Sequence, residues 1–426
     1  MVAGTYRPPA DKSITHRSIF FAALSAKKSV IRNALLSGDC KSTIGCFRAL
    51  GVPIQVQGRT VTVSSGNLNK NFPYRNFSAP KKKLDCGNSG TTMRLISGVL
   101  AAQAFSSVLT GDASLSKRPM RRVLDPLRKM GANIRAKDDN FAPLHIEPCA
   151  NLHAIEWKSS VASAQVKSCV LLAGLFCDGK TVVQEPVLSR DHSERMLATL
   201  GVQLQRKGTR VSLQGRQKLG ALHLTVPADF SSAAFFIVAA LMVPGSNLVL
   251  KEVNLNPTRS GMLKVLKRMG AKILIRNQRQ NDGEPIADIV VRYSALKATN
   301  VSAQEIPAMI DEVPVIALLA TQAQGVTTIR GAEELRVKES NRLEAMAKNL
   351  SKMGAKIRET KDGLRIEGKT ILKGAVVQSY DDHRIAMALA VAAQIAEGKT
   401  TIQNAECTHI SFPSFYQDLN NLLHVK

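Results

Sequence analysis

Polar groups that include a cation stand at the expected start of a helix at three points of the chain. These are Lys12-Ser13, Lys338-Glu339-Ser340 and Asp382-His383-Arg384. Serine and aspartate are ordinary helix caps, but the helix dipole disfavours a cation at an N-terminus. An anion bound between the cation and the helix end removes that conflict. The pattern therefore predicts anion binding by Lys12, Lys338 and Arg384, with simple capping as the alternative.

The helices that follow such polar groups are apolar nearly all round. Clear cases are Val166–Phe176, Ala233–Val243 and Ile385–Ile395. A helix that is apolar on every side is buried. We therefore expect the polar residues to be carried on the ends of core helices, which hold them rigidly.

Five helical segments end in one phrase: Leu or Met, then Gly, a small residue, any residue, and Ile or Leu. The phrase predicts a helix closed by a C′ glycine, after which the chain enters a strand. Together with FYQDLNNLL near the C-terminus, the five copies indicate six repeated units. The glycines are Gly51, Gly131, Gly201, Gly270 and Gly354.

A second similarity relates the two halves of the chain. PADKS (9–13) and PADFS (227–231) are each followed by an apolar helical run that ends in Ala-Ala-Leu. Alternating segments such as Arg59–Val63 and Asp288–Arg292 read as strands. The sequence predicts an α/β protein with two domains of three units each, and crossovers near residues 12–13 and 227–229. The first domain should span 14–226, and the second should combine 1–11 with 230–426.

Composition excludes several classes of protein. The 426 residues are 44% hydrophobic and 21% charged, which supports a sizeable core. The longest uncharged apolar run, Ala233–Val243, is too short for a membrane span, which needs roughly 20 residues. Seven cysteines without a CxxC pair, and no visible signal peptide, favour a reducing cytoplasm. No GxGxxG follows a strand, so dinucleotide binding has little support.

The formal net charge is +25, which fits nucleic acid, an anionic membrane or small anionic substrates. Aromatic residues are only 4% of the chain, which is poor material for base stacking. The cations are also spread along the whole sequence. We therefore attribute most of the excess to a solvated basic surface or a basic proteome, with a part of it lining a pocket for small anions, and we disfavour nucleic acid.

Eight motifs in order resemble those of the enolpyruvyl transferases, most closely the EPSP synthase branch. They cover essentially the whole chain: DKSITHR (11–17), LDCGNSGTTMR (84–94), SKRPM (116–120), ASAQVKS (162–168), SRDH (189–192), IDE (310–312), LRVKESNR (335–342) and YDDHR (380–384). The resemblance implies two domains of three βαβαββ-like repeats, an inside-out α/β barrel arrangement, with the active site in the cleft between the domains.

The resemblance also implies a reaction. Phosphoenolpyruvate would give its enolpyruvyl group to the 5-hydroxyl of shikimate 3-phosphate, and phosphate would leave, with no metal and no organic cofactor. The two substrates would be the only partners of a monomeric cytoplasmic enzyme of aromatic amino-acid biosynthesis. In such families glyphosate occupies the phosphoenolpyruvate site, and Ala at the position of Gly90 is associated with tolerance.

Site residues follow from the resemblance motif by motif. For shikimate 3-phosphate they are Lys12, Ser13, Arg17, Ser163, Ala164, Gln165, Arg190, Asp311 and Lys338. For phosphoenolpyruvate they are Lys12, Asn88, Gly90, Arg118, Gln165, Arg342, His383 and Arg384. In catalysis, Asp311 would accept the hydroxyl proton, Glu339 would handle the proton at C3, and Lys12 would assist the departing phosphate. The two carboxylates' assignments could be reversed. Taken alone, each carboxylate could equally stabilise a helix start.

Departures from the usual motifs include PADK for PGDK, Ala164 for a second Ser, Asn341 for Asp and Ile410 for a late Lys. The nearest competing family is the UDP-N-acetylglucosamine enolpyruvyl transferase, which shares the fold. That family typically has a reactive Cys in the loop matching Gly111–Met120, where this chain has none. Two further hypotheses stay open at this point, a basic RNA-binding repeat protein and an inactive homologue.

Overall fold

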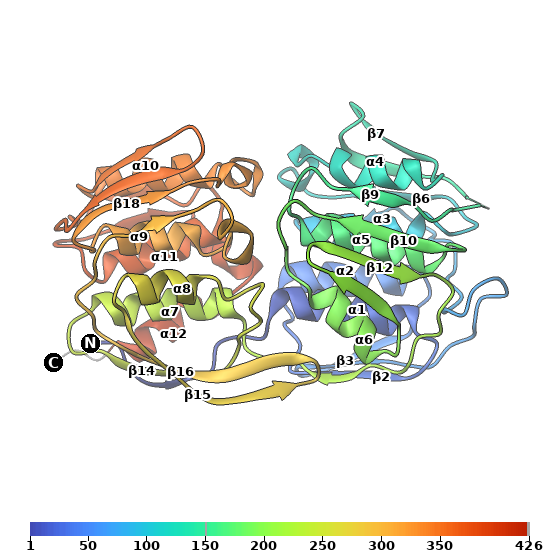
Figure 1. Ribbon diagram of the computed structural model, residues 1–426, viewed down its shortest axis with the longest axis horizontal. Helices are drawn as coiled ribbons and strands as arrows, with labels where there is room; N and C mark the ends of the chain where they lie inside the picture. The colour runs from blue at the N-terminus through green and yellow to red at the C-terminus, as the bar shows by residue number, and fades with distance from the viewer. Residues whose placement is uncertain (150, 424–426) are drawn as a thin grey trace. The chain divides into compact units, whose positions relative to one another are not determined.

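Six copies of one small α/β unit make up the chain, as the computed structural model shows for residues 1–149 and 151–423 (Figure 1). In chain order each copy runs strand, helix, strand, helix, and then, in all but the last, a hairpin of two strands. Contacts divide the chain into two compact units. We call Ala10–Val226 with Asn281–Glu284 the N-terminal unit. Met1–Pro9, Pro227–Gln280 and the chain from Pro285 onward form the C-terminal unit.

The N-terminal unit has three inner helices, three outer helices and three sheets. The inner helices α1 (Lys12–Leu24), α3 (Gly90–Leu100) and α5 (Ala164–Leu175) are buried over almost their whole length. The outer helices are α2 (Gly38–Ala49), α4 (Arg121–Lys129) and α6 (His192–Thr199). The first sheet has the strand order β13 (His223–Thr225), β2 (Ser29–Arg32), β4 (Thr60–Val63), β3 (Ile54–Gln57). The second has the order β5 (Leu84–Asp85), β6 (Ser107–Thr110), β8 (Phe141–Ile146), β7 (Ile134–Lys137). The third has the order β9 (Glu156–Lys158), β10 (Lys180–Gln184), β12 (Arg210–Gln214), β11 (Leu204–Lys207).

The C-terminal unit repeats this plan with a shorter last copy. Its inner helices α7 (Phe230–Met242), α9 (Val313–Ala320) and α11 (His383–Ala393) pack on one another. The outer helices are α8 (Met262–Arg268), α10 (Arg342–Lys352) and α12 (Phe415–Leu422). One sheet has the strand order β1 (Ala3–Tyr6), β14 (Asn247–Asn254), β16 (Glu284–Arg292), β15 (Lys272–Asn281). The next has the order β17 (Asn300–Val301), β18 (Gly325–Ile329), β20 (Leu364–Gly368), β19 (Lys356–Glu359). The last is the pair β21 (Val376–Gln378) and β22 (Thr401–Gln403).

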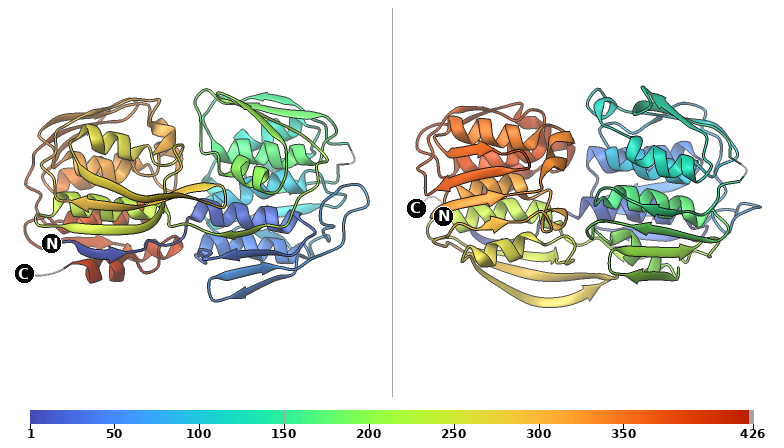
Figure 2. Two further views of the ribbon diagram at one scale, coloured as in Figure 1. Left: turned by 60° about the horizontal axis from the view of Figure 1, so that its bottom comes forward. Right: turned by 45° about the horizontal axis from the view of Figure 1, so that its top comes forward.

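In each unit, one sheet includes a strand that is distant in sequence from the strand it pairs with. β1 runs parallel to β14, with Ala3 opposite Asn247, so the N-terminal strand belongs to the C-terminal unit. β13 runs parallel to β2, with His223 opposite Val30. The long β15–β16 hairpin, yellow in Figure 2, has its turn residues 281–284 grouped with the N-terminal unit. The chain therefore passes from one unit to the other close to these strands.

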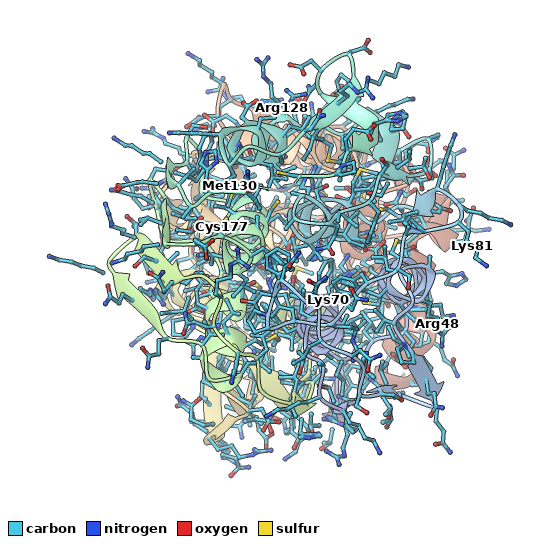
Figure 3. The ribbon with its side chains drawn as sticks, turned by 90° about the vertical axis from the view of Figure 1, so that its right-hand side faces the viewer. Arg48, Lys70, Lys81, Arg128, Met130 and Cys177 are labelled. Atoms are coloured by element: carbon cyan, nitrogen blue, oxygen red, sulfur yellow. The ribbon has the colours of Figure 1, made fainter. Side chains whose placement is uncertain are left out.

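The predicted helix-ending glycines are confirmed at all five positions. Their φ angles lie between 82° and 96°, in the left-handed region that glycine adopts without strain. At each, the glycine N–H bonds to the carbonyl three residues back, and the next N–H bonds to the carbonyl five residues back, as Gly51 to Arg48 and Val52 to Phe47 illustrate. This is the Schellman arrangement. Arg48 and Arg128, labelled in Figure 3, occupy equivalent positions and donate to the carbonyls of Ile54 and Ile134.

The apolar helices predicted to be buried are the inner helices α5, α7 and α11. The strands predicted at Arg59–Val63 and Asp288–Arg292 lie in β4 and β16. Within the described part of the chain, no helix is long and apolar enough to cross a bilayer. The inner helices matter for function because their N-termini carry most of the predicted site residues.

Candidate active site

The start of α1 carries a cation, as predicted. Lys12 is the first residue of the helix, and Asp11 caps it by accepting the N–H of Ile14 at 2.8 Å. The Lys12 ammonium lies 3.0 Å from Asp39 Oδ2, a residue of α2 that the sequence analysis did not single out. Asp39 offsets the charge of Lys12 beside the helix dipole and holds the ammonium in place.

Arg17 is 3% exposed, although it lies one turn along the same helix. Its guanidinium donates to Ser193 Oγ at 2.9 Å and to Ser168 Oγ at 3.1 Å. Burial, with a contribution from the charge of Arg190, lowers the pKa of Arg17 to about 10, against the opposing effect of Glu194. Two arginines close enough to repel each other favour an anion near them. Ser163, which caps α5, and Ala164, its first residue, belong to the same unit.

A second group of cations and amides surrounds the start of α3. Asn88 accepts from Arg118 at 2.8 Å, and Arg118 also donates to Ser114. Gln165 of α5 accepts from Arg94 of α3 at 2.7 Å and donates to Thr91. Gly90 is the first residue of α3, and a Cβ added there would lie 2.8 Å from the Arg94 guanidinium. The absent side chain leaves room between two guanidinium groups.

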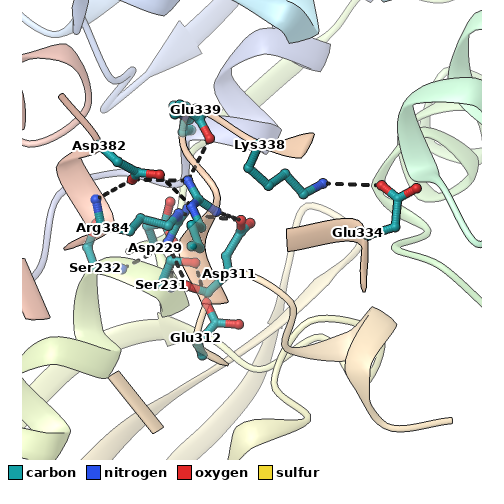
Figure 4. Close-up of polar contacts among 12 residues, drawn as sticks. Asp229, Ser231, Ser232, Asp311, Glu312, Glu334, Lys338, Glu339, Asp382 and Arg384 are labelled. Carbon is teal, nitrogen blue, oxygen red and sulfur yellow. Dashed lines mark hydrogen bonds and ion pairs between the residues drawn. The ribbon is translucent and has the colours of Figure 1, made fainter. Parts of the chain in front are cut away.

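In the C-terminal unit, three carboxylates meet one buried arginine (Figure 4). Arg342, 2% exposed, contacts Asp382 at 2.7 Å, Glu339 at 2.6 Å and Asp311 at 3.3 Å. Burial alone would lower the pKa of Arg342, but Asp382, Glu339 and Asp311 more than offset this and raise it above its usual value. The arginine therefore stays charged and fixes both predicted catalytic carboxylates.

Arg384 joins the same cluster from α11. Its guanidinium Nε lies 3.4 Å from Asp311 Oδ1, and its Nη1 donates to the Asp311 carbonyl at 3.3 Å. Asp382 caps α11 by accepting the N–H of Arg384 at 2.9 Å. His383, the first residue of the helix, is buried beside them. A cation near a helix start is thus confirmed for Arg384.

The prediction for Lys338 needs correction. The helix α10 begins at Arg342 and is capped by Asn341, which accepts the N–H of Glu344, so Lys338 lies four residues before it. Lys338 follows the 3-10 helix Glu333–Val337 and lies 3.8 Å from Glu334. The pattern was misread because a 3-10 helix and an α-helix here follow each other closely. Arg342, not Lys338, is the cation at this helix start.

Each unit thus assembles its own share of the predicted residues. The N-terminal unit holds Lys12, Ser13, Arg17, Asn88, Gly90, Arg118, Ser163, Ala164, Gln165 and Arg190, and the C-terminal unit holds Asp311, Lys338, Glu339, Arg342, His383 and Arg384. Sequence reasoning missed Arg94 and Asp39 as members of these clusters, and it gave Asp382 only as a residue at a helix start. Arg94 and Asp382 stand inside quoted motifs, so their position was a usable signal. Asp39 offered none.

Comparisons with known proteins show the family of the chain. A family model described as EPSP synthase (3-phosphoshikimate 1-carboxyvinyltransferase) matches residues 1–419. The chain belongs to the EPSP synthase family. A 3-phosphoshikimate 1-carboxyvinyltransferase of Endomicrobium trichonymphae is 50% identical over 423 residues, which is 99% of this chain and 97% of the relative. One from Brevibacillus brevis is 49% identical over 97% of this chain and 96% of its own length.

Solved structures of the EPSP synthase family and its relatives confirm the predicted fold. An EPSP synthase structure from Acinetobacter baumannii has a TM-score of 0.87 and 42% identity, covering 99% of this chain and 95% of the other. The enolpyruvyl transferase NikO from Streptomyces tendae has a TM-score of 0.79 at 19% identity, covering 99% and 95%. The second likeness supports the fold alone. The α/β enolpyruvyl-transferase fold implied by the motif resemblance is therefore established.

Proposed function

We propose that the chain transfers the enolpyruvyl group of phosphoenolpyruvate to the 5-hydroxyl of shikimate 3-phosphate, releasing phosphate. Family membership over nearly the full length supports this reaction. Both substrates are small polyanions, and both units carry buried or half-buried arginines. Residues of both units then act on the same two substrates.

Shikimate 3-phosphate binds through its phosphate to Ser163, Gln165 and Arg190, with Arg17 close by. The mutual repulsion of Arg17 and Arg190 supports this assignment, because an arriving phosphate dianion relieves it. Lys12, Ser13 and Ala164 complete the contacts in the N-terminal unit, and Asp311 and Lys338 supply those of the C-terminal unit. A guanidinium suits a phosphate because its fork of N–H donors matches the phosphate oxygens.

Phosphoenolpyruvate binds to the start of α3 and to the arginines of the C-terminal unit. Asn88, Gly90, Arg118 and Gln165 receive one of its anionic groups, and Lys12 lies at the start of the neighbouring helix. Arg342, Arg384 and His383 receive the other. In this arrangement the ligand takes over donors of Arg384 that Asp311 holds at 3.3 to 3.4 Å.

The chemistry is an addition followed by an elimination. The 5-hydroxyl oxygen bonds to C2 of phosphoenolpyruvate while its proton leaves and C3 gains a proton, giving a tetrahedral ketal. Then C3 loses a proton, the C2–O bond to phosphate breaks, and the enol double bond returns. Asp311 takes the hydroxyl proton, Glu339 moves the proton at C3, and Lys12 stabilises the departing phosphate.

The cluster around Arg342 carries this assignment. Of the three carboxylates on Arg342, Asp311 has the longest contact, at 3.3 Å against 2.7 and 2.6 Å. Asp311 also lies 3.4 Å from Arg384 Nε, so two arginines assigned to phosphoenolpyruvate position this carboxylate beside that substrate. Glu339 is bound more closely to Arg342, which fixes its position.

A coupled phosphate-release assay tests the reaction. Phosphate should appear only when phosphoenolpyruvate and shikimate 3-phosphate are both present, and omitting either should abolish it. Replacing shikimate 3-phosphate by UDP-N-acetylglucosamine tests the nearest competing family. Phosphate release from phosphoenolpyruvate with UDP-N-acetylglucosamine but not with shikimate 3-phosphate would contradict the proposal and favour the other transferase. No release with either acceptor would favour an inactive homologue.

The remaining properties belong to the same proposal. We infer a monomeric, cytoplasmic enzyme that needs no cofactor and binds neither nucleic acid nor membrane. The low aromatic content supports the statement on nucleic acid. Retention on heparin with a steep salt dependence, together with displacement by RNA, would contradict it.

A further inference from the structure

A buried ionic cluster lies in the N-terminal unit, outside the residues assigned to substrate. Lys167 Nζ is 2.8 Å from Glu185 Oε2 and 2.8 Å from Glu194 Oε1, and the side chains of Lys167 and Glu185 are each 1% exposed. One cation and two carboxylates give the cluster a formal charge of −1. Buried ion pairs often contribute little net stability, because desolvation offsets their attraction. The burial of the cluster is therefore weak evidence for a purely stabilising role.

The cluster joins two loops that carry predicted phosphate contacts. Glu185 accepts the backbone N–H of Ser163 at 3.1 Å through one oxygen and that of Ser189 at 3.3 Å through the other. Lys167 donates to the Ser189 carbonyl at 3.4 Å. Both backbone groups of the residue before Arg190 are thus held. One carboxylate sets the position of Ser163 relative to the loop that bears Arg190.

The cluster also adjoins the partners of Arg17. Ser168 and Ser193, which accept from Arg17, stand next in sequence to Lys167 and Glu194 and lie 2.7 Å from each other. Glu194 acts electrostatically on Arg17 in the direction that keeps it charged. A negative charge behind the arginines compensates their repulsion before the phosphate arrives.

We propose that Glu185, together with Lys167 and Glu194, is the positioning group for the phosphate end of shikimate 3-phosphate. It touches no substrate and acts through Ser163, Arg190 and Arg17. The inference rests on the proposed function, since it concerns the phosphate of that substrate. It assigns to this buried cluster the discrimination between phosphorylated and unphosphorylated shikimate.

The experiment compares the affinities for shikimate 3-phosphate and for shikimate, measured by calorimetry, in the wild type and in Glu185→Gln and Glu185→Asp. Glu185→Gln should weaken shikimate 3-phosphate by about 10-fold or more, the scale of hydrogen bonds to a charged group. Shikimate should change by less than about 2-fold. Glu185→Asp keeps the negative charge but has a side chain shorter by one methylene. The ratio of the affinities for shikimate 3-phosphate and shikimate should therefore fall in part.

Glu312→Gln is the matched control. Glu312 is equally buried, pairs with Arg259 at 2.8 Å, and belongs to the C-terminal unit. Its substitution should leave the ratio of the two affinities unchanged. Variants that retain the wild-type ratio while melting at a lower temperature would overturn the inference and leave a structural role. A wild type that binds both ligands equally would overturn the proposed function and the inference with it.

Discussion

Asp382 accepts hydrogen bonds from Arg342 with both carboxylate oxygens and also caps the helix that carries Arg384. Its Oδ2 accepts from Arg342 Nε at 2.7 Å, and its Oδ1 accepts from Arg342 Nη2 at 3.3 Å and from the Arg384 backbone at 2.9 Å. Asp382 is completely buried. One carboxylate therefore fixes Arg342 and Arg384, two of the three arginines assigned to phosphoenolpyruvate.

Replacing this carboxylate should weaken phosphoenolpyruvate use. In Asp382→Asn, Arg342 loses the carboxylate that accepts from it through both oxygens and is left to Glu339 and Asp311. We expect kcat/KM for phosphoenolpyruvate to fall by about 10- to 150-fold, the effect of losing one buried hydrogen bond to a charged group. Steady-state kinetics measures this. Asp381→Asn, at the exposed neighbouring position, is the control and should stay close to wild type.

The proton-acceptor role of Asp311 predicts a loss in turnover more than in binding. Asp311→Ala should lower kcat by at least about 100-fold, the usual contribution of a general base. The affinity for shikimate 3-phosphate should fall much less, because its phosphate is bound elsewhere. The exposed Glu333→Ala serves as the comparison. Turnover near the wild-type value in Asp311→Ala would remove this residue from the mechanism.

Local sequence rules were sufficient for the repeats but not for the ion pairs. The five helix-ending glycines were predictable because the left-handed conformation is a local requirement. The starts of α1 and α11 were predictable from a cap followed by an apolar run. The 3-10 helix before Lys338 broke this rule, since its short turn has no distinct cap in the sequence.

Partners that lie far apart in the sequence needed the tertiary structure. Lys12 and Asp39 are 27 residues apart, and Arg342 and Asp382 are 40 apart, so no spacing rule connects them. The pairing of β13 with β2 joins residues from the two ends of the N-terminal unit in the same way. The family motifs pointed to the residues we propose as catalytic, whereas packing alone determines which carboxylate meets which cation.

His16 predicts an acid-sensitive stability. Burial, with the nearby charges of Lys12 and Arg17, lowers the pKa of His16 well below 6.5. As the pH falls below about 6.5, the unfolded chain binds a proton that the folded chain does not. The free energy of unfolding should therefore decrease, by up to about 1.4 kcal/mol per pH unit from this residue.

His16→Gln should remove this part of the pH dependence. Glutamine does not titrate and can still bond to Thr43, which lies 2.7 Å from His16 Nδ1. Urea unfolding between about pH 7.5 and pH 5 measures the slope. His145→Gln, on an exposed position of β8, should keep the wild-type slope. Identical slopes in the wild type and His16→Gln would show that His16 is protonated in the folded state as easily as in the unfolded one.

We expect Gly90→Ala to give selective resistance to glyphosate, which the family resemblance places in the phosphoenolpyruvate site. The φ angle of Gly90 is not among the positive values, so alanine is compatible with its backbone at the start of α3. The added methyl would lie 2.8 Å from Arg94 Nη1 and 3.6 Å from Arg118 Nη1. The Arg94 guanidinium must then shift, and it is tied to Gln165. The change therefore falls on side chains that surround the proposed phosphoenolpyruvate contacts rather than on the turn.

Inhibition by glyphosate should be competitive with phosphoenolpyruvate, and Gly90→Ala should raise the inhibition constant more than the KM. Overpacking typically costs about 1–3 kcal/mol, which is roughly 5- to 150-fold in affinity. Gly45→Ala is the control, since a Cβ at that position in α2 has nothing within 4 Å. It should leave both constants unchanged. Equal losses for inhibitor and substrate in Gly90→Ala would mean that the methyl damages the whole anion site, and the selectivity argument would fail.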